Sequence, residues 1–131
     1  MISRPLSEAD LHLVMLEAIE EGLTIDLQPF CERLQVDRRD LLNQVSIAVA
    51  RDFLSNTRDF EFGDEVMNAL ISPIVDVSMH EEMPQPAFDI YQAFDAGEYL
   101  HTGDAQDVCP WEKHTRPGLE NILRNHLPTL E

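Results

Sequence analysis

Residues 94–114, FDAGEYLHTGDAQDVCPWEKH, hold most of the side chains that could perform chemistry. The stretch contains five carboxylates, two histidines, one cysteine and the only tryptophan of the chain. Side chains of these types can bind a metal ion, pair a nucleophile with a base, or form a surface that binds another protein. These three hypotheses make different demands on the spacing of the residues.

Metal binding is the first hypothesis. The histidine, cysteine and carboxylate ligands that zinc prefers are all present, as His101, Asp104, Cys109 and His114. Their spacing matches neither an HExxH helix nor the Asp-rich start of a calcium-binding loop. A metal- or small-ligand-binding domain built on residues 101–114 is therefore the alternative prediction, and no cofactor is predicted.

Catalysis is the second hypothesis. Cys109 combined with His101 or His114 would pair a nucleophile with a base. A reactive thiolate needs a nearby cation or helix N-terminus to lower its pKa, whereas the residues around Cys109 are mainly acidic. The chain also contains no GxSxG, P-loop or GxGxxG motif. No reaction class is indicated, so the sequence favours a binding role over an enzyme without deciding between them.

A protein-binding surface is the third hypothesis, and charge supports it. The formal net charge is −16, and residues 59–112 hold 13 Asp or Glu residues but no Lys or Arg. We call residues 59–112 the acidic block. Its field repels nucleic acid and anionic membranes, and it attracts basic proteins. The predicted partner is therefore a basic protein; no membrane is predicted, and nucleic acid is disfavoured.

Aromatic and acidic residues alternate near the end of the acidic block. Aromatic side chains can anchor a partner while carboxylates steer and pair its basic groups. The candidate binding residues are Tyr99, His101, Asp104, Asp107, Trp111 and Glu112. The most concrete form of this prediction is an inhibitor or immunity-type protein, which masks a basic partner by presenting carboxylates where phosphates would bind.

The elements that position these residues are predicted to be helices. Apolar residues recur at helical spacing after a Ser7 cap, which predicts a helix over 8–21 that Gly22 ends. A short helix is predicted over 26–34. Asp37 precedes a helix over 38–54 that is apolar on most faces and is therefore expected to be central. Further helices are predicted from residues 64 or 65 to 72, over 86–96, and from 116 onward.

Three segments break this helical pattern. Phe60 and Phe62 alternate with acids, which suggests a short extended piece or a loop. Pro73 predicts that a helix ends or kinks at Ser72, so that residues 74–77 are strand-like or continue the turn. Residues 97–115 are expected to form one long loop, and loops of this length are usually functional or mobile.

A helix-turn-helix that binds DNA is the second alternative, over residues 26–45. The segment has a short helix, a turn at 35–37, and Arg38 and Arg39 at the start of the next helix, where base edges are read. Gln35 stands where such turns usually have glycine. The chain also lacks the basic face that phosphate contacts require, so this alternative is disfavoured.

Composition sets the class of the protein. A chain of 131 residues with 44% hydrophobic residues is long enough to close one core, so we predict a single all-α domain over 1–131. It forms a compact bundle of about five to six helices. No apolar stretch reaches the length of a membrane span, and acids interrupt the N-terminal segment early, which favours the cytoplasm. Cys31 and Cys109 are expected to be reduced thiols.

Overall fold

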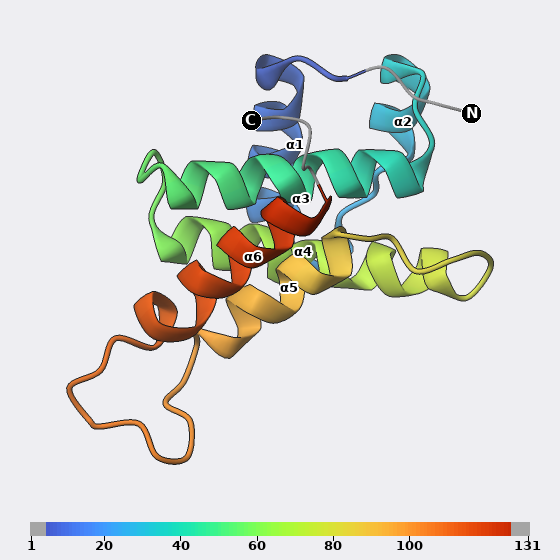
Figure 1. The fold of residues 1–131 in the computed structure, drawn as a ribbon. Coiled ribbons are helices and arrows are strands. Elements are labelled where there is room, and N and C mark those ends of the chain that lie inside the picture. The colour runs from blue at the N-terminus through green and yellow to red at the C-terminus, as the bar shows by residue number, and fades with distance from the viewer. Residues whose placement is uncertain (1–4, 127–131) are drawn as a thin grey trace.

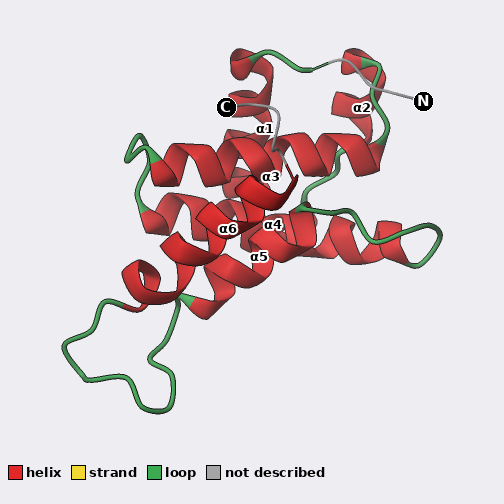
Figure 2. Ribbon diagram, viewed as in Figure 1, coloured by secondary structure: helices red, strands yellow, loops and turns green. Residues whose placement is uncertain are grey.

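The computed structural model describes residues 5–126, which form helices joined by loops, with no strand among them (Figure 2). The α-helices of this range are α1 (Glu8–Glu21), α2 (Gln28–Leu34), α3 (Arg38–Leu54), α4 (Phe60–Ser78), α5 (Ala87–Ala96) and α6 (Arg116–His126). Two short turns of other helical types accompany them, namely the 3₁₀ turn η1 (Gly22–Thr24) and the π-helical turn η2 (Trp111–Thr115). The predicted all-α bundle of about six helices is confirmed.

The helices form layers around a central pair. Helices α3 and α4 pack against each other, with α1 on one side and α5 and α6 on the other (Figure 1). Side chains from all three layers are fully buried between them: Val14, Met15, Leu41, Leu42, Val45, Val49, Met67, Leu70, Ile74, Ile90, Phe94 and Leu119. The expected central position of residues 38–54 is therefore confirmed, and α4 shares it. No helix of the described range is long and apolar enough to cross a membrane.

Helices α1 and α3 have the bounds that their caps predict. The Ser7 hydroxyl accepts a hydrogen bond from the amide of Asp10 at 3.1 Å, and the Asp37 carboxylate accepts one from the amide of Asp40 at 2.7 Å. Each bond satisfies an amide that the first helical turn leaves without a partner. Gly22, with φ of +57°, follows the end of α1.

Helix α4 is longer than predicted at both ends. The Asp59 carboxylate accepts a hydrogen bond from the amide of Phe62 at 2.9 Å, so the helix begins at Phe60. The prediction of an extended piece or loop at this point is wrong. Pro73 lies inside the helix, which continues to Ser78, so the strand-like alternative for residues 74–77 is also wrong.

The continuation past Pro73 has a physical explanation in the core. An interior proline costs about 3 kcal/mol because it removes a hydrogen bond and crowds the preceding turn. Ile74 and Val77 beyond it are both buried. Burying such side chains contributes about 1.5–3 kcal/mol each, which offsets the cost.

The predicted long loop is shorter than expected. Helix α5 ends before Gly97, and the chain is without helical structure until η2 begins at Trp111 and leads directly into α6. We call residues 99–110, the part of this segment after Glu98, the Asp104 loop. It extends away from one end of the bundle, drawn in orange in Figure 1.

Candidate functional site

The candidate binding residues separate into two places. Tyr99, His101 and Asp104 lie in the Asp104 loop, whereas Trp111 lies in η2 and faces the start of α4. Asp107 is exposed, and no hydrogen bond or ion pair within residues 5–126 involves its side chain. The predicted residues therefore do not form a single cluster.

Asp104 is the centre of its loop. Its carboxylate accepts hydrogen bonds from the His101 amide at 2.9 Å, from His114 Nε2–H at 2.7 Å, and from the Lys113 ammonium. The Asp104 side chain is only 3% exposed. The hydrogen bonds from His114 and then from Lys113 hold the pKa of Asp104 well below its usual range. The loop itself thus uses the hydrogen-bonding capacity of this carboxylate.

His101 of the loop and His114 of η2 converge. The His101 ring lies between Tyr99, at 4.6 Å between ring centroids, and His114, at 3.9 Å. His101 Nε2–H donates to the carbonyl oxygen of Ala96 at 2.8 Å. Three of the residues selected from the sequence, His101, Asp104 and His114, therefore lie together. Their polar atoms bond to one another and to the backbone.

No metal centre is apparent in this arrangement. Within the described residues, no group of three or more His, Cys, Asp or Glu side chains is placed to hold a metal ion. Cys109, the remaining member of the alternative ligand set, is a half-buried free thiol, as is Cys31. The geometry gives the metal alternative no support beyond the composition of the stretch.

Glu112 has a structural partner in α6. The guanidinium of Arg116 donates to Glu112 at 2.8 Å and to the carbonyl oxygen of Leu54 at 3.2 Å. The same guanidinium lies over the Phe53 ring, 4.5 Å from its centroid. Glu112 therefore helps to hold η2 and α6 against the end of α3.

Trp111 has one packed face and remains partly open to solvent. Its ring stacks on Phe60 with centroids 4.9 Å apart and planes 15° apart, and Phe60 in turn contacts Phe53 and Phe94. The side chain of Trp111 is nevertheless 38% exposed. The geometry is compatible both with packing on the bundle and with an exposed anchor for a partner.

Trp111 forms one wall of a cavity of about 610 Å³ beside the start of α4. We call it the acidic pocket, and it is lined by Asp59, Phe60, Glu61, Asp64, Asn68, Glu98 and Trp111. No described lysine, arginine or histidine lines it. Sequence reasoning selected only Trp111 from this set, because the lining residues come from three separate segments.

Two carboxyl groups meet on the floor of the acidic pocket. The side-chain amide of Asn68 donates to Asp64 at 3.3 Å and to Glu98 at 3.0 Å, which brings the two acids together. Asp64 Oδ1 is buried and has no hydrogen-bond partner in the described part of the chain. Burial, followed by the hydrogen bond with Glu98 and its charge, raises the pKa of Asp64 to about 8.

Gly97 makes this geometry possible. A Cβ atom at this position would lie 2.1 Å from Thr115 Oγ1 and 3.0 Å from the Cα atom of Trp111. Only glycine therefore lets the end of α5 approach η2 so closely. The approach places Glu98, the next residue, beside Trp111 in the lining of the pocket.

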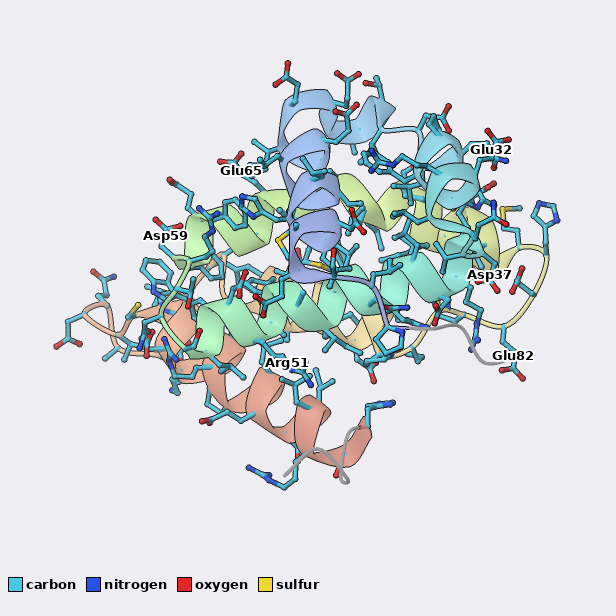
Figure 3. The ribbon with its side chains drawn as sticks, turned by 90° about the horizontal axis from the view of Figure 1, so that it is seen from above. Glu32, Asp37, Arg51, Asp59, Glu65 and Glu82 are labelled. Carbon is cyan, nitrogen blue, oxygen red and sulfur yellow. The ribbon has the colours of Figure 1, made fainter. Side chains whose placement is uncertain are left out.

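The possible helix-turn-helix has the two helices and the turn that were predicted, but its two arginines are not free. Arg38 forms an ion pair with Asp76 of α4 at 2.7 Å, and Arg39 lies 3.7 Å from Glu82. Figure 3 shows Glu32, Asp37 and Glu82 at this same end of the molecule. Both arginines that would read DNA are thus engaged by acids.

The Asp104 loop and the acidic pocket differ in what they leave for a partner. In the first, His101, Asp104 and His114 are bonded to one another and to the backbone, whereas the pocket leaves a carboxyl pair without a cation and a tryptophan partly open. Comparison of the chain with protein-family models, with curated proteins and with solved structures found no match. The function is therefore inferred from the geometry of the pocket.

Proposed function

We propose that the protein binds a basic partner protein by accepting an arginine side chain into the acidic pocket. The observation that carries this proposal is the pairing of Asp64 with Glu98 beside the partly exposed ring of Trp111. Paired carboxyls without a cation are electrostatically unfavourable, and a cation from a partner relieves the repulsion.

The remaining acids of the pocket do not carry the proposal. Asp59 caps α4, and Glu61 lies in its first turn, where a negative charge is favourable. Both are therefore explained by the helix alone. Asp64 lies beyond the first turn, and Glu98 follows α5, so neither has such a role.

Arginine suits this pocket better than lysine. A guanidinium is planar, stacks on aromatic faces and donates several hydrogen bonds in a fixed geometry. Trp111 offers the aromatic surface, and Asp64 and Glu98 offer carboxyl oxygens. The ammonium group of lysine is not planar, so it cannot stack on the Trp111 ring as a guanidinium can.

The charge of the whole chain supports the same role. A net charge of −16 accelerates the association of a basic partner, and the pocket then supplies the specific contact. An inhibitor or immunity-type activity is the concrete form of this proposal, in which the acidic face covers a basic surface of the partner.

Titration with a nona-arginine peptide tests the proposal. Trp111 is the only tryptophan, so its fluorescence reports on the pocket directly. We expect a saturable change in low salt, and a double variant, Asp64→Asn with Glu98→Gln, that binds about tenfold more weakly because both carboxyls are lost.

A matched control removes the same charge elsewhere in the acidic block. The double variant Glu81→Gln with Glu82→Gln alters two exposed acids of the 79–86 linker and changes the formal net charge equally. Its affinity should stay within about twofold of the parent, since it affects only long-range steering. An equal loss in both double variants would contradict the pocket, and no binding by the parent protein would overturn the proposal.

A further inference from the structure

The carboxyl pair of the acidic pocket resists full ionisation while the pocket is empty. Asp64 and Glu98 share the amide of Asn68, and the buried Oδ1 atom of Asp64 accepts no hydrogen bond within residues 5–126. Two carboxyls in such proximity retain one proton between them, because two adjacent negative charges repel each other.

The groups around the pair favour retention of that proton. Helix α4 contributes Asp59 and Glu61, and α5 contributes Asp95 and Tyr91. Burial raises the pKa of Tyr91, and the negative charges of Asp95, Glu98 and Asp64 raise it further. No cation among the described residues opposes this field at the pocket.

We propose that an arginine entering the acidic pocket replaces the proton that Asp64 and Glu98 share, so that binding releases a proton to solvent. This inference rests on the proposed function, since it assigns a regulation to the same site. The exchange is balanced in charge: one proton leaves and one guanidinium enters. Binding is thereby sensitive to pH near neutrality.

The direction of the pH dependence follows from this exchange. Because Asp64 has a pKa of about 8, the empty pocket holds the proton at pH 7 and has largely lost it at pH 9. Arginine remains charged throughout this range. We expect the affinity for nona-arginine to rise about tenfold from pH 7 to pH 9 and to level off above that.

Isothermal titration calorimetry with nona-arginine measures the released proton directly. Titrations at pH 7 in phosphate and in Tris buffer differ in their binding heat. The difference equals the number of protons released multiplied by the difference between the ionisation enthalpies of the two buffers. We expect about one proton for each pocket filled. The Asp64→Asn variant should release none and should show an affinity that is flat from pH 7 to pH 9 and weaker than that of the parent at pH 7.

The outcomes separate this inference from the proposed function. Absence of binding at every pH would overturn the proposed function and this inference with it. Binding with a flat pH dependence and equal heats in both buffers would overturn the inference alone. Proton release that persists in Asp64→Asn would assign the proton to other groups and would also overturn it. A circular-dichroism melt of the variant establishes that it is folded.

Discussion

Asp64 and Asp104 are aspartates of the same acidic block with opposite surroundings. Asp104 accepts hydrogen bonds from His101, Lys113 and His114, and its pKa lies well below the usual range. Asp64 faces another carboxyl, and its pKa is raised to about 8. The difference lies in the neighbouring donors and not in the residue, because the same side chain is stabilised as an anion at one site and as an acid at the other.

This contrast separates polar groups that hold the fold together from polar groups that remain available to a partner. The stretch around the Asp104 loop has the composition of a reactive site, but the polar groups of His101, Asp104 and His114 are engaged with one another and with the backbone. The acidic pocket contains fewer types of reactive side chain, but no cation neutralises its carboxyl pair. Variants can test whether these two regions are as independent as their contacts indicate.

The largest effect is expected from Gly97→Ala, because Gly97 lies where the two regions meet. The added Cβ would collide with Thr115 Oγ1 at 2.1 Å and would press on the backbone of Trp111 at 3.0 Å. We expect the free energy of unfolding to fall by about 2–3 kcal/mol, as for other overpacked sites, and Trp111 emission to shift to the red. Chemical denaturation with fluorescence detection measures both.

Gly118→Ala is the matched control. The nearest atom to its Cβ would be the Cβ of Ala93 at 3.6 Å, an ordinary contact, and Gly118 lies within α6. Stability should be unchanged or rise by up to about 1 kcal/mol, since alanine favours helices. Equal destabilisation by both substitutions would show that the close approach at Gly97 is not special.

The fold was largely predictable where local caps determine an element. Ser7 and Gly22 delimit α1, and Asp37 starts α3, so both helices were placed correctly from the sequence. Helix α4 was not, because Phe60 and Phe62 alternate with acids as in a strand. Their helical state depends on the Asp59 cap and on packing of Phe60 against Phe53 and Phe94, which only the folded structure brings together.

The site was predictable only in part. Composition identified His101, Asp104 and His114 only as candidates, and the structure shows that these residues, which are near one another in the chain, also lie together. The acidic pocket joins α4, the residue after α5 and η2, and no sequence pattern links Asp64 with Glu98. The only signal for it was that both acids and Trp111 belong to the block without Lys or Arg.

Asp104→Asn is expected to have a smaller effect than Gly97→Ala, because the loop lies at the surface. The variant loses the anionic acceptor for Lys113 and His114, so the melting temperature should fall at pH 7 and the loop should be cleaved faster by proteases. A carboxyl with a lowered pKa stabilises the folded state above its ordinary pKa of 3.8, and this contribution is lost as the pH falls below that value.

The difference between Asp104→Asn and the parent should therefore narrow as the pH falls from 5 towards 3. Melting curves at several pH values check this. A difference that is constant with pH would mean that the carboxylate charge of Asp104 does not hold the loop. A loss of nona-arginine binding greater than threefold would contradict the independence of loop and pocket.

Asp64→Asn is expected to stabilise the protein, in contrast to Asp104→Asn. The folded parent keeps the Asp64 proton, whereas the unfolded chain loses it as the pH rises from about 4 to about 8, so parent stability declines over this window. The variant avoids this decline. After allowance for solvent screening, its advantage is on the order of 1 kcal/mol at pH 8–9 and vanishes near pH 4.

Melting curves of parent and Asp64→Asn across pH 4–9 test this sign. An advantage of the variant that is the same at pH 4 and pH 9 would indicate a packing effect unrelated to the proton. A variant less stable than the parent at pH 9 would mean that the ionised Asp64 is favourable in the fold, and the contrast with Asp104 would then disappear.

Asp107→Asn should have the smallest effect on stability and on the affinity for nona-arginine. It adds a third aspartate to the comparison of Asp64 with Asp104. Asp107 belongs to the Asp104 loop and to the acidic block, but it is exposed and has no partner in the described part of the chain. Stability should stay within about 0.5 kcal/mol of the parent. The affinity for nona-arginine should fall less than twofold in low salt and not at all near 0.15 M salt, where the charge is screened. A tenfold loss would show that the field of the block recognises the partner, and that the pairing of Asp64 with Glu98 does not.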